Sequence, residues 1–559
     1  MVVSSSISAI RHPPQFSTFG LKKALILFGP GILLLAWFLP AFWDAGFSWD
    51  DRKVLFENPA IRDLDVWGLF RHGYWAWHGD PPMFRPLASL SLSLDLHVFG
   101  GNPLALHRST LLLHGLSSLF LAWGVSRFQA KILPFVFLLL YLHPVASEQA
   151  FWISGRSGVL MYLFLGIGLG LGIQASRSEG RSLWWAMLFL LFAALSREDG
   201  ILGFPILFFW VPRGRRLGFA LASTALCLLW AGLRVFALSR FLGGGGDLLR
   251  GAGLWERLLS GADWFAHSIR MLLLWEPPRI LSAGIPSTHW MRILLPLFFL
   301  AFVLAFVRRW SRELRFVLLW AFLGSLPFLR LFPLAEGLAG RYAYVLLPPL
   351  ALGLGLAFIR LKRFQTWMLF TPLVLFPWTL KQWRTIAKEE QAYLQVLEVD
   401  PGDRRALSLL ANALEAQGKG DEALRAYREL TERFPRYPKA WVNLGNLLFR
   451  LGRRSEGLAV LEKSCQRFPR HALAWLSLGR ARFATGANKK AATAFATALK
   501  LAPRLGQAAR FLCRARLKLG HWKAAAQALE QAKHIDPRHP SLVKLAEKLA
   551  ITRRKEQGR

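Results

Sequence analysis

Residues 401–435 read PGDRRALSLLANALEAQGKGDEALRAYRELTERFP, and the pattern of this stretch returns in the three that follow it. Proline recurs every 34 residues, and a glycine recurs with the same period midway between the prolines. The positions of this punctuation are Pro401, Pro435, Pro469, Pro503 and Pro537, with Gly418, Gly452, Gly486 and Gly520 between them. A fixed period of this length indicates a repeat in which each unit holds two helices.

The period and its residues are those of the tetratricopeptide pattern. A small residue in each unit lets the paired helices approach closely, and the proline stops the second helix. We predict a domain over 386–559 with repeats near 401–434, 435–468, 469–502 and 503–536, and a final helix near 540–555. Four repeats form a short superhelix with a concave groove. Such a groove binds a peptide or protein, and a spacer role is the alternative.

The first part of the chain is too apolar for a soluble protein. The sequence is 53% hydrophobic, with 24 Trp and 43 Phe, and the apolar content fills residues 21–380. Because about 20 apolar residues cross a bilayer, this part predicts an all-α polytopic membrane domain over 21–385 with about eleven spans. A short cytoplasmic tail, 1–20, precedes it, and an outer loop, 44–103, follows the first span. The spans are expected at 24–43, 104–126, 130–147, 157–175, 183–196, 200–212, 217–238, 291–307, 314–329, 343–359 and 364–380.

Basic residues give the orientation of these spans, because cytoplasmic loops are enriched in Lys and Arg. With the N-terminus inside, every inner loop is basic, and the outer loops carry most of the acids. An odd number of spans then puts the repeats outside. No Asn-x-Ser/Thr sequon occurs and the outer loops are compact. Both features favour a bacterial inner membrane, with the repeats on its periplasmic side.

The net charge is +36, and residues 401–559 contribute 33 Lys and Arg against 12 Asp and Glu. Such a surface favours anionic lipid headgroups, anionic glycans or acidic proteins. No nucleic-acid-binding motif accompanies the charge, and solvated helix faces are the alternative. The three cysteines form no CxxC pair, so they indicate neither a disulfide framework nor a metal site.

Ionisable residues gather at the ends of the predicted outer loops, and such residues near membrane spans are costly and usually functional. Singly, each has a structural explanation, such as an arginine reaching the interface or a histidine satisfying a carbonyl. Together they place acids and arginines from separate loops at one face. The candidate site residues are Asp50, Asp51, Arg85, His107, His143, Glu148, Arg156, Arg197, Glu198, Arg341 and Tyr342.

This mixture fits one kind of chemistry. A carboxylate can take a proton from an attacking hydroxyl. Arginines can hold and neutralise a phosphate leaving group. A phosphate tethered to a lipid has to be met at the membrane surface. Sugar transfer from a polyprenyl-phosphate sugar needs all three, and the residues assign no metal site.

The order of the motifs resembles a known family. Paired acids follow the first span, and then come FRPL, two histidines seven residues apart, HPVASEQA with SGR, SREDGI and GRYAY, followed by the repeats. This order is similar to that of the transmembrane and tetratricopeptide-repeat-containing O-mannosyltransferases, which are GT-C glycosyltransferases. The chain departs from the family at Thr110, where an Asn is usual, at Ala146, where a His is usual, and at Gly340, where a Glu is frequent.

The resemblance implies Asp50 or Asp51 as the base that binds the acceptor. It implies Arg85, His143, Arg156, Arg197 and Arg341 for the donor phosphate and sugar. It also implies inversion in a single displacement, and a divalent cation on the phosphate in some relatives.

The expected function is therefore transfer of a mannose-like hexose to Ser or Thr hydroxyls of a protein held by the repeat groove. The alternatives are a transferase acting on lipid or envelope glycan, and a membrane-anchored scaffold without catalysis. The outer polar cluster argues against a pure scaffold, and the repeats favour a protein acceptor.

Overall fold

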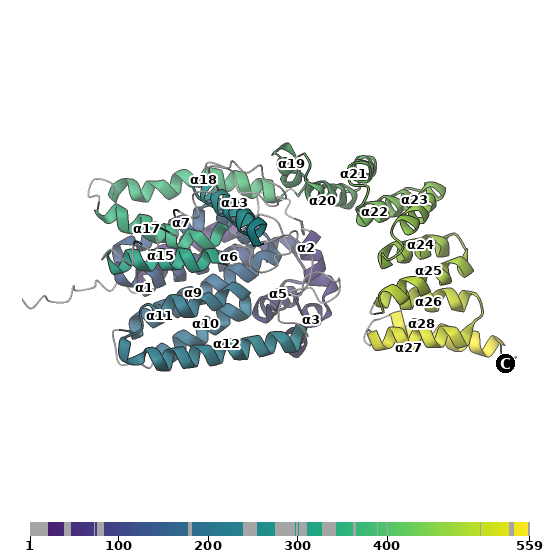
Figure 1. Cartoon of the computed structure of the whole chain (residues 1–559), viewed down its shortest axis with the longest axis horizontal. Helices are drawn as coiled ribbons and strands as arrows, with labels where there is room; N and C mark the ends of the chain where they lie inside the picture. The colour runs from purple at the N-terminus through teal and green to yellow at the C-terminus, as the bar shows by residue number, and fades with distance from the viewer. Residues whose placement is uncertain are drawn as a thin grey trace, which may run out of the picture. The chain divides into compact units, whose positions relative to one another are not determined.

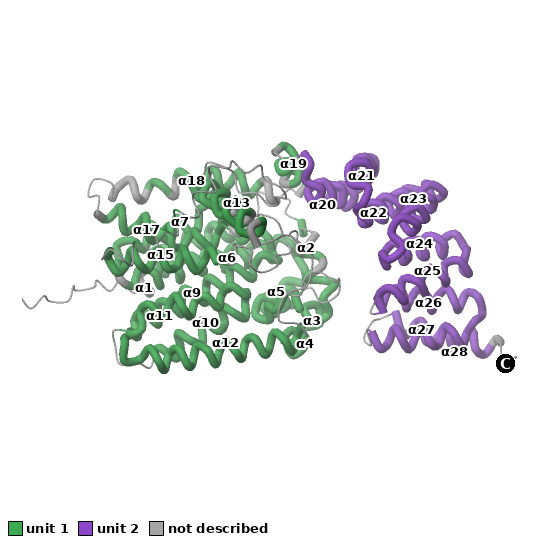
Figure 2. The backbone as a smooth tube through the Cα atoms, viewed as in Figure 1, with its two compact units in different colours: residues 1–400 green, residues 401–559 purple. Residues whose placement is uncertain are grey.

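Over the residues that it describes, the computed structural model is entirely helical, so the predicted all-α class is confirmed. It divides into two compact units, residues 1–400 and 401–559 (Figures 1 and 2). The sequence placed the boundary at 386, and α19 (Glu389–Val399) falls within the first unit. The described residues are 21–38, 46–47, 49–71, 73–74, 83–176, 182–238, 254–273, 297, 300, 304, 310–326, 343–360, 365–387, 389–399, 401–503, 505–535 and 541–556.

The helices of the first unit follow the predicted apolar segments closely, and the predicted outer loop is itself largely helical. Asn102 shows how local residues fix a boundary, because its side chain accepts from the Ala105 amide and Pro103 occupies the first helical position. The helices used below are α1 (Leu21–Phe38), α2 (Trp49–Arg52), α5 (Pro86–Phe99), α6 (Pro103–Val125), α7 (Leu133–Leu142), α8 (Ser147–Phe151), α9 (Arg156–Ala175), α10 (Ser182–Ser196), α11 (Gly203–Phe208), α12 (Arg216–Leu238), α13 (Leu254–Leu272), α15 (Arg312–Ser325), α17 (Leu347–Arg360) and α18 (Gln365–Ala387).

Glycines bring α6 and α9 into close contact. A Cβ on Gly124 would lie 2.4 Å from the Gly166 carbonyl oxygen, and a Cβ on Gly166 would lie 2.5 Å from the Leu121 nitrogen. Small residues allow membrane helices to approach this closely, since van der Waals packing drives their association. The α6–α9 pair therefore forms the centre of the first unit, with α10 against the other side of α9.

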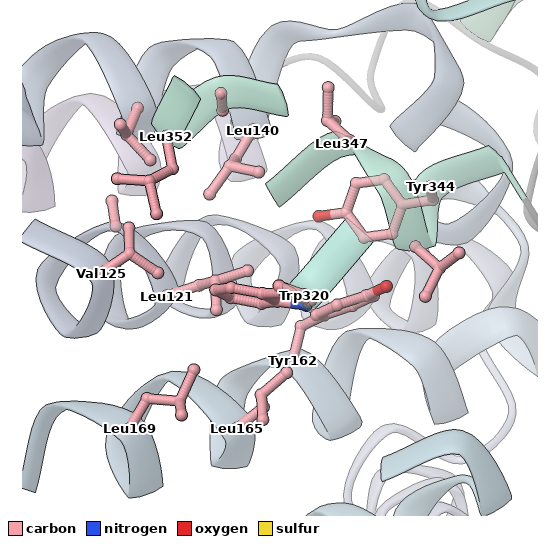
Figure 3. Close-up of a cluster of buried hydrophobic side chains, with 14 of the residues drawn as sticks. Leu121, Val125, Leu140, Tyr162, Leu165, Leu169, Trp320, Tyr344, Leu347 and Leu352 are labelled. Carbon is pink, nitrogen blue, oxygen red and sulfur yellow. The ribbon is translucent and has the colours of Figure 1, made fainter. Parts of the chain in front are cut away.

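A single apolar core joins the early helices of this unit to the late ones (Figure 3). In it Tyr162 of α9 meets Tyr344 edge to face, with ring centroids 4.8 Å apart. α15 contributes Trp320, which is almost completely buried. The other labelled members of the core are Leu121, Val125, Leu140, Leu165, Leu169, Leu347 and Leu352.

The chain reverses direction after α10, as the sequence predicted for the SREDG stretch. Gly200 lies against the backbone of Ala193, and Gly203 lies against Leu190, about one turn earlier on α10. Further on, Leu207 packs against Gly172 near the C-terminal end of α9. Residues 198–208 thus run antiparallel to α10, and the two apolar runs are not one broken helix.

The number of membrane spans is smaller in the described residues than the predicted count of about eleven. Two helical segments, Ile153–Ala175 and Arg213–Leu238, are long and apolar enough to cross a bilayer. A third candidate is the pair Ala130–Leu142 and Pro144–Phe151, which is bent by 53°. Four further apolar helices are shorter than a full span: Leu25–Ala36, Pro86–Phe99, Leu183–Ser196 and Tyr344–Ile359. The predicted span at 291–307 lies almost wholly outside the described residues.

The second unit consists of helix pairs with the predicted period. In each pair the first helix is followed by a glycine with positive φ, between 78° and 84°, a conformation that residues with a Cβ rarely adopt. These are the four glycines with the 34-residue period. The pairs are α20 (Arg404–Ala416) with α21 (Gly420–Arg433), α22 (Pro438–Arg450) with α23 (Arg454–Arg467), α24 (Ala472–Ala484) with α25 (Asn488–Leu501), and α26 (Gly506–Lys518) with α27 (Trp522–Ile535), followed by α28 (Ser541–Glu556).

Candidate functional site

The segment Ser154–Gly158, with the sequence SGRSG, lies where α9 begins, and its residues contact side chains from several other segments. The Ser154 amide donates to Asp51 Oδ1 at 2.7 Å, and its carbonyl accepts from the Tyr74 hydroxyl at 2.8 Å. Ser157 Oγ accepts from Arg85 Nη1 at 3.2 Å. We call this segment the SGRSG junction. It holds the N-terminal end of α9 to α2 and to the start of α5.

The last position of the junction is tightly enclosed by side chains. A Cβ on Gly158 would lie 2.0 Å from Gln149 Oε1 and 3.0 Å from Arg197 Nη1. The predicted site residue Arg197 therefore reaches the junction from the loop after α10, where its Nε also pairs with Asp199 at 3.1 Å.

The predicted site residue Arg156 is completely buried in the junction, and all three of its guanidinium nitrogens are engaged. Nη1 pairs with Asp95 at 2.5 Å and donates to Ser91. Nη2 donates to Thr110 Oγ1 at 2.7 Å and to the Leu106 carbonyl at 3.2 Å. Nε donates to Thr110 as well, at 3.3 Å. No surface of this guanidinium is left for a substrate, so Arg156 ties α9 to α5 and α6.

Glu198 links two arginines at the edge of this cluster. Its carboxylate pairs with Arg85 Nε at 3.0 Å and Arg234 Nη1 at 3.2 Å, and it accepts from the Phe84 amide at 3.2 Å. Burial alone would raise the pKa of Glu198, but Arg85 and Arg234 outweigh burial and lower the pKa to about 2. The carboxylate is thus ionised at neutral pH. The side chains of Arg85 and Glu198 are 17% and 26% exposed, so a substrate can reach this group.

The predicted histidines are held by backbone atoms. His143 Nδ1 accepts from the Val145 amide and Nε2 donates to the Leu272 carbonyl, which joins the α7–α8 bend to α13. His107 Nε2 lies 3.2 Å from the Gly46 carbonyl oxygen. Both histidines and the predicted Glu148 are buried. These three residues therefore lie in the packed interior around the junction.

Asp50 and Asp51 lie together in α2. The Asp51 side chain is buried, with 1% exposure, and it is fixed by the Ser154 amide. For Asp50 the structure describes the backbone alone. The predicted site residues Arg341 and Tyr342 lie outside the described residues.

The opposite end of the bundle is basic. Arg127 at the end of α6 donates to Gln174 Oε1 near the end of α9 at 2.7 Å. Arg312 at the start of α15 stacks on Trp210, with its guanidinium 4.4 Å from the ring centroid. Arg213 and the rest of the 3₁₀ helix Arg213–Arg215 follow this tryptophan. Lys and Arg in the loops at one end of a membrane bundle are typical of its cytoplasmic side.

The last helix of the bundle runs toward the end that carries the junction. Its Thr379 hydroxyl donates to the Leu142 carbonyl at the end of α7. One turn later Trp383 packs against Phe151 of α8, with ring centroids 4.5 Å apart. α18 therefore ends on the same side as the junction, and the chain leaves the bundle there. In Figure 1, α2, α3 (Pro59–Arg62) and α5 lie beyond the ends of α9 and α10 at this side.

Sequence reasoning missed three members of the cluster: Tyr74, Asp95 and Arg234. Asp95 is the one carboxylate in the apolar helix α5, and Arg234 is a charged residue inside the apolar run of α12. A charge inside an apolar helix was the signal that could have revealed both. In the part of the chain that the structure describes, no group of three or more His, Cys, Asp or Glu side chains could hold a metal ion.

Comparison with known proteins finds the tetratricopeptide repeat by its family model and partial similarity to O-mannosyl-transferases. Residues 390–438, 408–472 and 442–505 match the family model of the tetratricopeptide repeat, which confirms the predicted kind of repeat as far as residue 505. Over 126 residues the chain is 32% identical to Protein O-mannosyl-transferase TMTC1 of Homo sapiens, an alignment that covers 21% of this chain and 14% of the human protein. Protein O-mannosyl-transferase TMTC4 of Mus musculus is 25% identical over 189 residues, which cover 28% of this chain and 26% of the mouse protein.

The predicted resemblance to the tetratricopeptide-repeat-containing O-mannosyltransferases is thus confirmed. The chain spans about a quarter or less of the length of these relatives. Among solved structures, the repeat protein TTC0263 of Thermus thermophilus is 25% identical and covers 30% of this chain and 91% of its own, with a TM-score of 0.26. MamA of Desulfovibrio magneticus RS-1 is 20% identical and covers 28% and 92%, with a TM-score of 0.25.

Proposed function

We propose that this protein is an integral-membrane glycosyltransferase of the GT-C type that moves a mannose-like hexose from a polyprenyl-phosphate donor to Ser or Thr hydroxyls of proteins. The observation that carries the proposal is the SGRSG junction. Carboxylates and arginines from separate segments converge on it at one end of an apolar helical bundle. The names of the relatives support the same activity.

The junction separates residues that position the site from residues that can contact a substrate. Arg156 and Asp51 are buried and fully committed to fixing α9, α5 and α2. Arg85 and Glu198 are partly exposed, whereas Arg234, which also pairs with Glu198, is largely buried. A lipid phosphate lying at the membrane surface would meet Arg85, because an arginine binds phosphate oxygens through paired N–H donors.

The reaction we propose is a single displacement at the anomeric carbon. A carboxylate of α2 takes the proton of the acceptor hydroxyl, the hydroxyl oxygen bonds to C1, and the bond from C1 to the phosphate oxygen breaks. The electron pair leaves with the polyprenyl phosphate, whose charge the arginines stabilise. Asp50 is the preferred base, because Asp51 is buried against the Ser154 amide.

The proposed topology has the N-terminus inside, about eleven spans, and both the junction and the repeats outside, at a bacterial inner membrane. The basic bundle end and the course of α18 support this orientation. The repeats would hold a protein acceptor, which is the reason for preferring a protein over a lipid or glycan acceptor.

The test compares Asp50→Asn, Asp51→Asn and a control, Asp63→Asn, for transfer from a polyprenyl-phosphate mannose to protein. Asp63 pairs with its neighbour Arg62 on the surface of the same unit. A positioned base contributes roughly 100- to 10,000-fold in rate, so we expect Asp50→Asn to lose at least two orders of magnitude while donor binding persists. Asp51→Asn should lower activity together with thermal stability, because it weakens the junction.

If Asp50→Asn and Asp51→Asn both kept the turnover of the unsubstituted protein, the proposed catalytic role of α2 would be wrong. The scaffold alternative predicts no transfer by the unsubstituted protein. A lipid or glycan transferase predicts that mass spectrometry of the membrane fraction finds the sugar on glycolipid and none on protein.

A further inference from the structure

The first helices of the four repeats, α20, α22, α24 and α26, line the inner side of the superhelix. α22 contacts α24 and α24 contacts α26, whereas the second helices α21, α23, α25 and α27 make no comparable contact with one another in the described part of the repeats. Helices on the inside of a curved stack lie closer together than those on the outside, so these first helices form the concave surface.

Side chains at equal positions of these helices form a row across the concave surface. The row consists of Asn412, Asn446, Arg480 and Arg514, which are spaced by the 34-residue period. It changes character halfway, because the first two repeats supply amides and the last two supply guanidinium groups.

In the first half the amides are held by hydrogen bonds between repeats. Asn443 Nδ2 donates to Asn412 Oδ1 at 3.3 Å, and the Tyr427 hydroxyl donates to the same oxygen at 2.5 Å. Asn446 Nδ2 donates to Ser477 Oγ at 3.2 Å in the next repeat. Each side-chain amide has further donors or acceptors in its inventory, and these can bind the backbone of an extended peptide.

In the second half the arginines are stacked between aromatic rings. The guanidinium of Arg514 lies 5.4 Å from the ring centroid of Phe483 and 5.2 Å from that of Phe511. The guanidinium of Arg480 lies 5.7 Å from Phe511. Stacking on a ring restricts a guanidinium group but leaves its edge of N–H donors available for a carboxylate.

The charge of the first helices is strongly one-sided. The four first helices carry ten Lys and Arg residues and a single carboxylate, Glu415. That carboxylate already pairs with Arg450. Both Arg480 and Arg514 are exposed, and no ion pair to either is found among the described residues. Arg480 and Arg514 can therefore accept a carboxylate partner from a bound ligand.

We propose that the concave surface binds an extended protein segment whose one half is neutral and whose other half carries Asp or Glu. The neutral half lies along Asn412 and Asn446, and the carboxylates bind Arg480 and Arg514. A peptide fits this surface better than a membrane does, because a bilayer is flat and cannot enter a concave groove. Under the proposed function this segment belongs to the acceptor protein, and to that extent the inference rests on that proposal.

Binding is measured by fluorescence anisotropy with the full-length protein in zwitterionic nanodiscs and without any sugar donor, so a failure of catalysis does not affect the readout. The probe is a labelled peptide of Gly and Ser in one half and Ser and Glu in the other, and the comparison peptide has Gln for every Glu. Arg480→Gln/Arg514→Gln should weaken binding of the Glu peptide about tenfold, the factor expected for two partly exposed ion pairs together. The matched control is Lys489→Gln/Lys490→Gln on α25, which removes the same charge from exposed lysines of the outer row and should change the affinity less than twofold.

A second pair of variants tests the amide half. Asn412→Ala/Asn446→Ala should weaken the Glu peptide and the Gln peptide by the same factor, because the amides contact the backbone. Equal affinity for the two peptides in the unsubstituted protein would overturn the proposal. Equal losses of affinity in the arginine and lysine double variants would also overturn it. So would loss of peptide binding when vesicles containing phosphatidylglycerol are added at a saturating peptide concentration, because that result would indicate a lipid ligand.

Discussion

Replacing Glu198 by Gln removes the charge that Arg85 and Arg234 share and keeps the shape of the side chain. The pKa of this carboxyl falls from an ordinary value of 4.5 to about 2 in the folded protein. A shift of that size corresponds to about 3 kcal/mol of stability. The substitution also leaves two partly buried guanidinium groups without their counterion, which is the costly way to break an ion pair.

The sign of the pH dependence follows from the direction of this shift. Because the folded-state pKa is depressed, the stabilisation is complete above pH 4.5 and is lost as the pH falls toward 2. Glu198→Gln should lower the free energy of unfolding by about 3 kcal/mol at pH 7. The stability of this variant should also fall less steeply than that of the unsubstituted protein between pH 5 and the lowest pH that the membrane mimic tolerates.

The assay is thermal unfolding in nanodiscs, followed by tryptophan fluorescence at several pH values. The control is Asp63→Asn, because Asp63 and Arg62 form an ion pair that is more than 40% exposed on both sides. Exposed pairs contribute less than about 1 kcal/mol. Equal shifts in the unfolding midpoint for Glu198→Gln and Asp63→Asn would refute the reasoning, as would an unchanged acid dependence in Glu198→Gln.

Three further outcomes test the packing and the orientation. Thr110→Val should cost about 1–3 kcal/mol, because it removes an acceptor from the buried guanidinium of Arg156, and Thr110→Asn should restore much of this loss; thermal unfolding measures both. Gly166→Ala should cost about 1–3 kcal/mol in the same assay, because its Cβ would overlap the α6 backbone, and an unchanged midpoint would contradict that close contact. In a chain without native cysteines, Lys490→Cys should react with an impermeant thiol reagent in intact spheroplasts and Gly214→Cys only after lysis; the reverse pattern would invert the proposed orientation.

The repeats could be predicted residue by residue because their boundaries are set locally. Each proline ends a helix and each glycine permits a left-handed turn, so the period fixes where helices begin and end. The predicted final helix at 540–555 agrees with α28 to within one residue at each end. Local signals of this kind can be interpreted without any knowledge of tertiary contacts.

The membrane part could be predicted only in outline. Apolar runs located α6, α9 and α12. The short runs at 183–196 and 200–212 were predicted as two spans, whereas α10 is shorter than a full span and α11 has six residues. Contacts between segments that are distant in the sequence could not be predicted either. Asp95 meets Arg156, and Arg234 meets Glu198, only because helices pack side by side, and nothing in the spacing of these residues predicts the pairs.

The charge of the group around Glu198 affects which ligand this group can bind. Glu198 pairs with Arg85 and Arg234, and Arg197 pairs with Asp199, so three cations accompany two carboxylates on neighbouring residues of the chain. Glu198 is ionised at neutral pH, so the group carries about one positive charge in excess. A sugar linked to a lipid through a phosphodiester brings one negative charge, which would balance this excess. Under the proposed function the lipid phosphate gains a second negative charge on transfer, and the arginines would stabilise it most as the bond to the sugar breaks, when catalysis needs it.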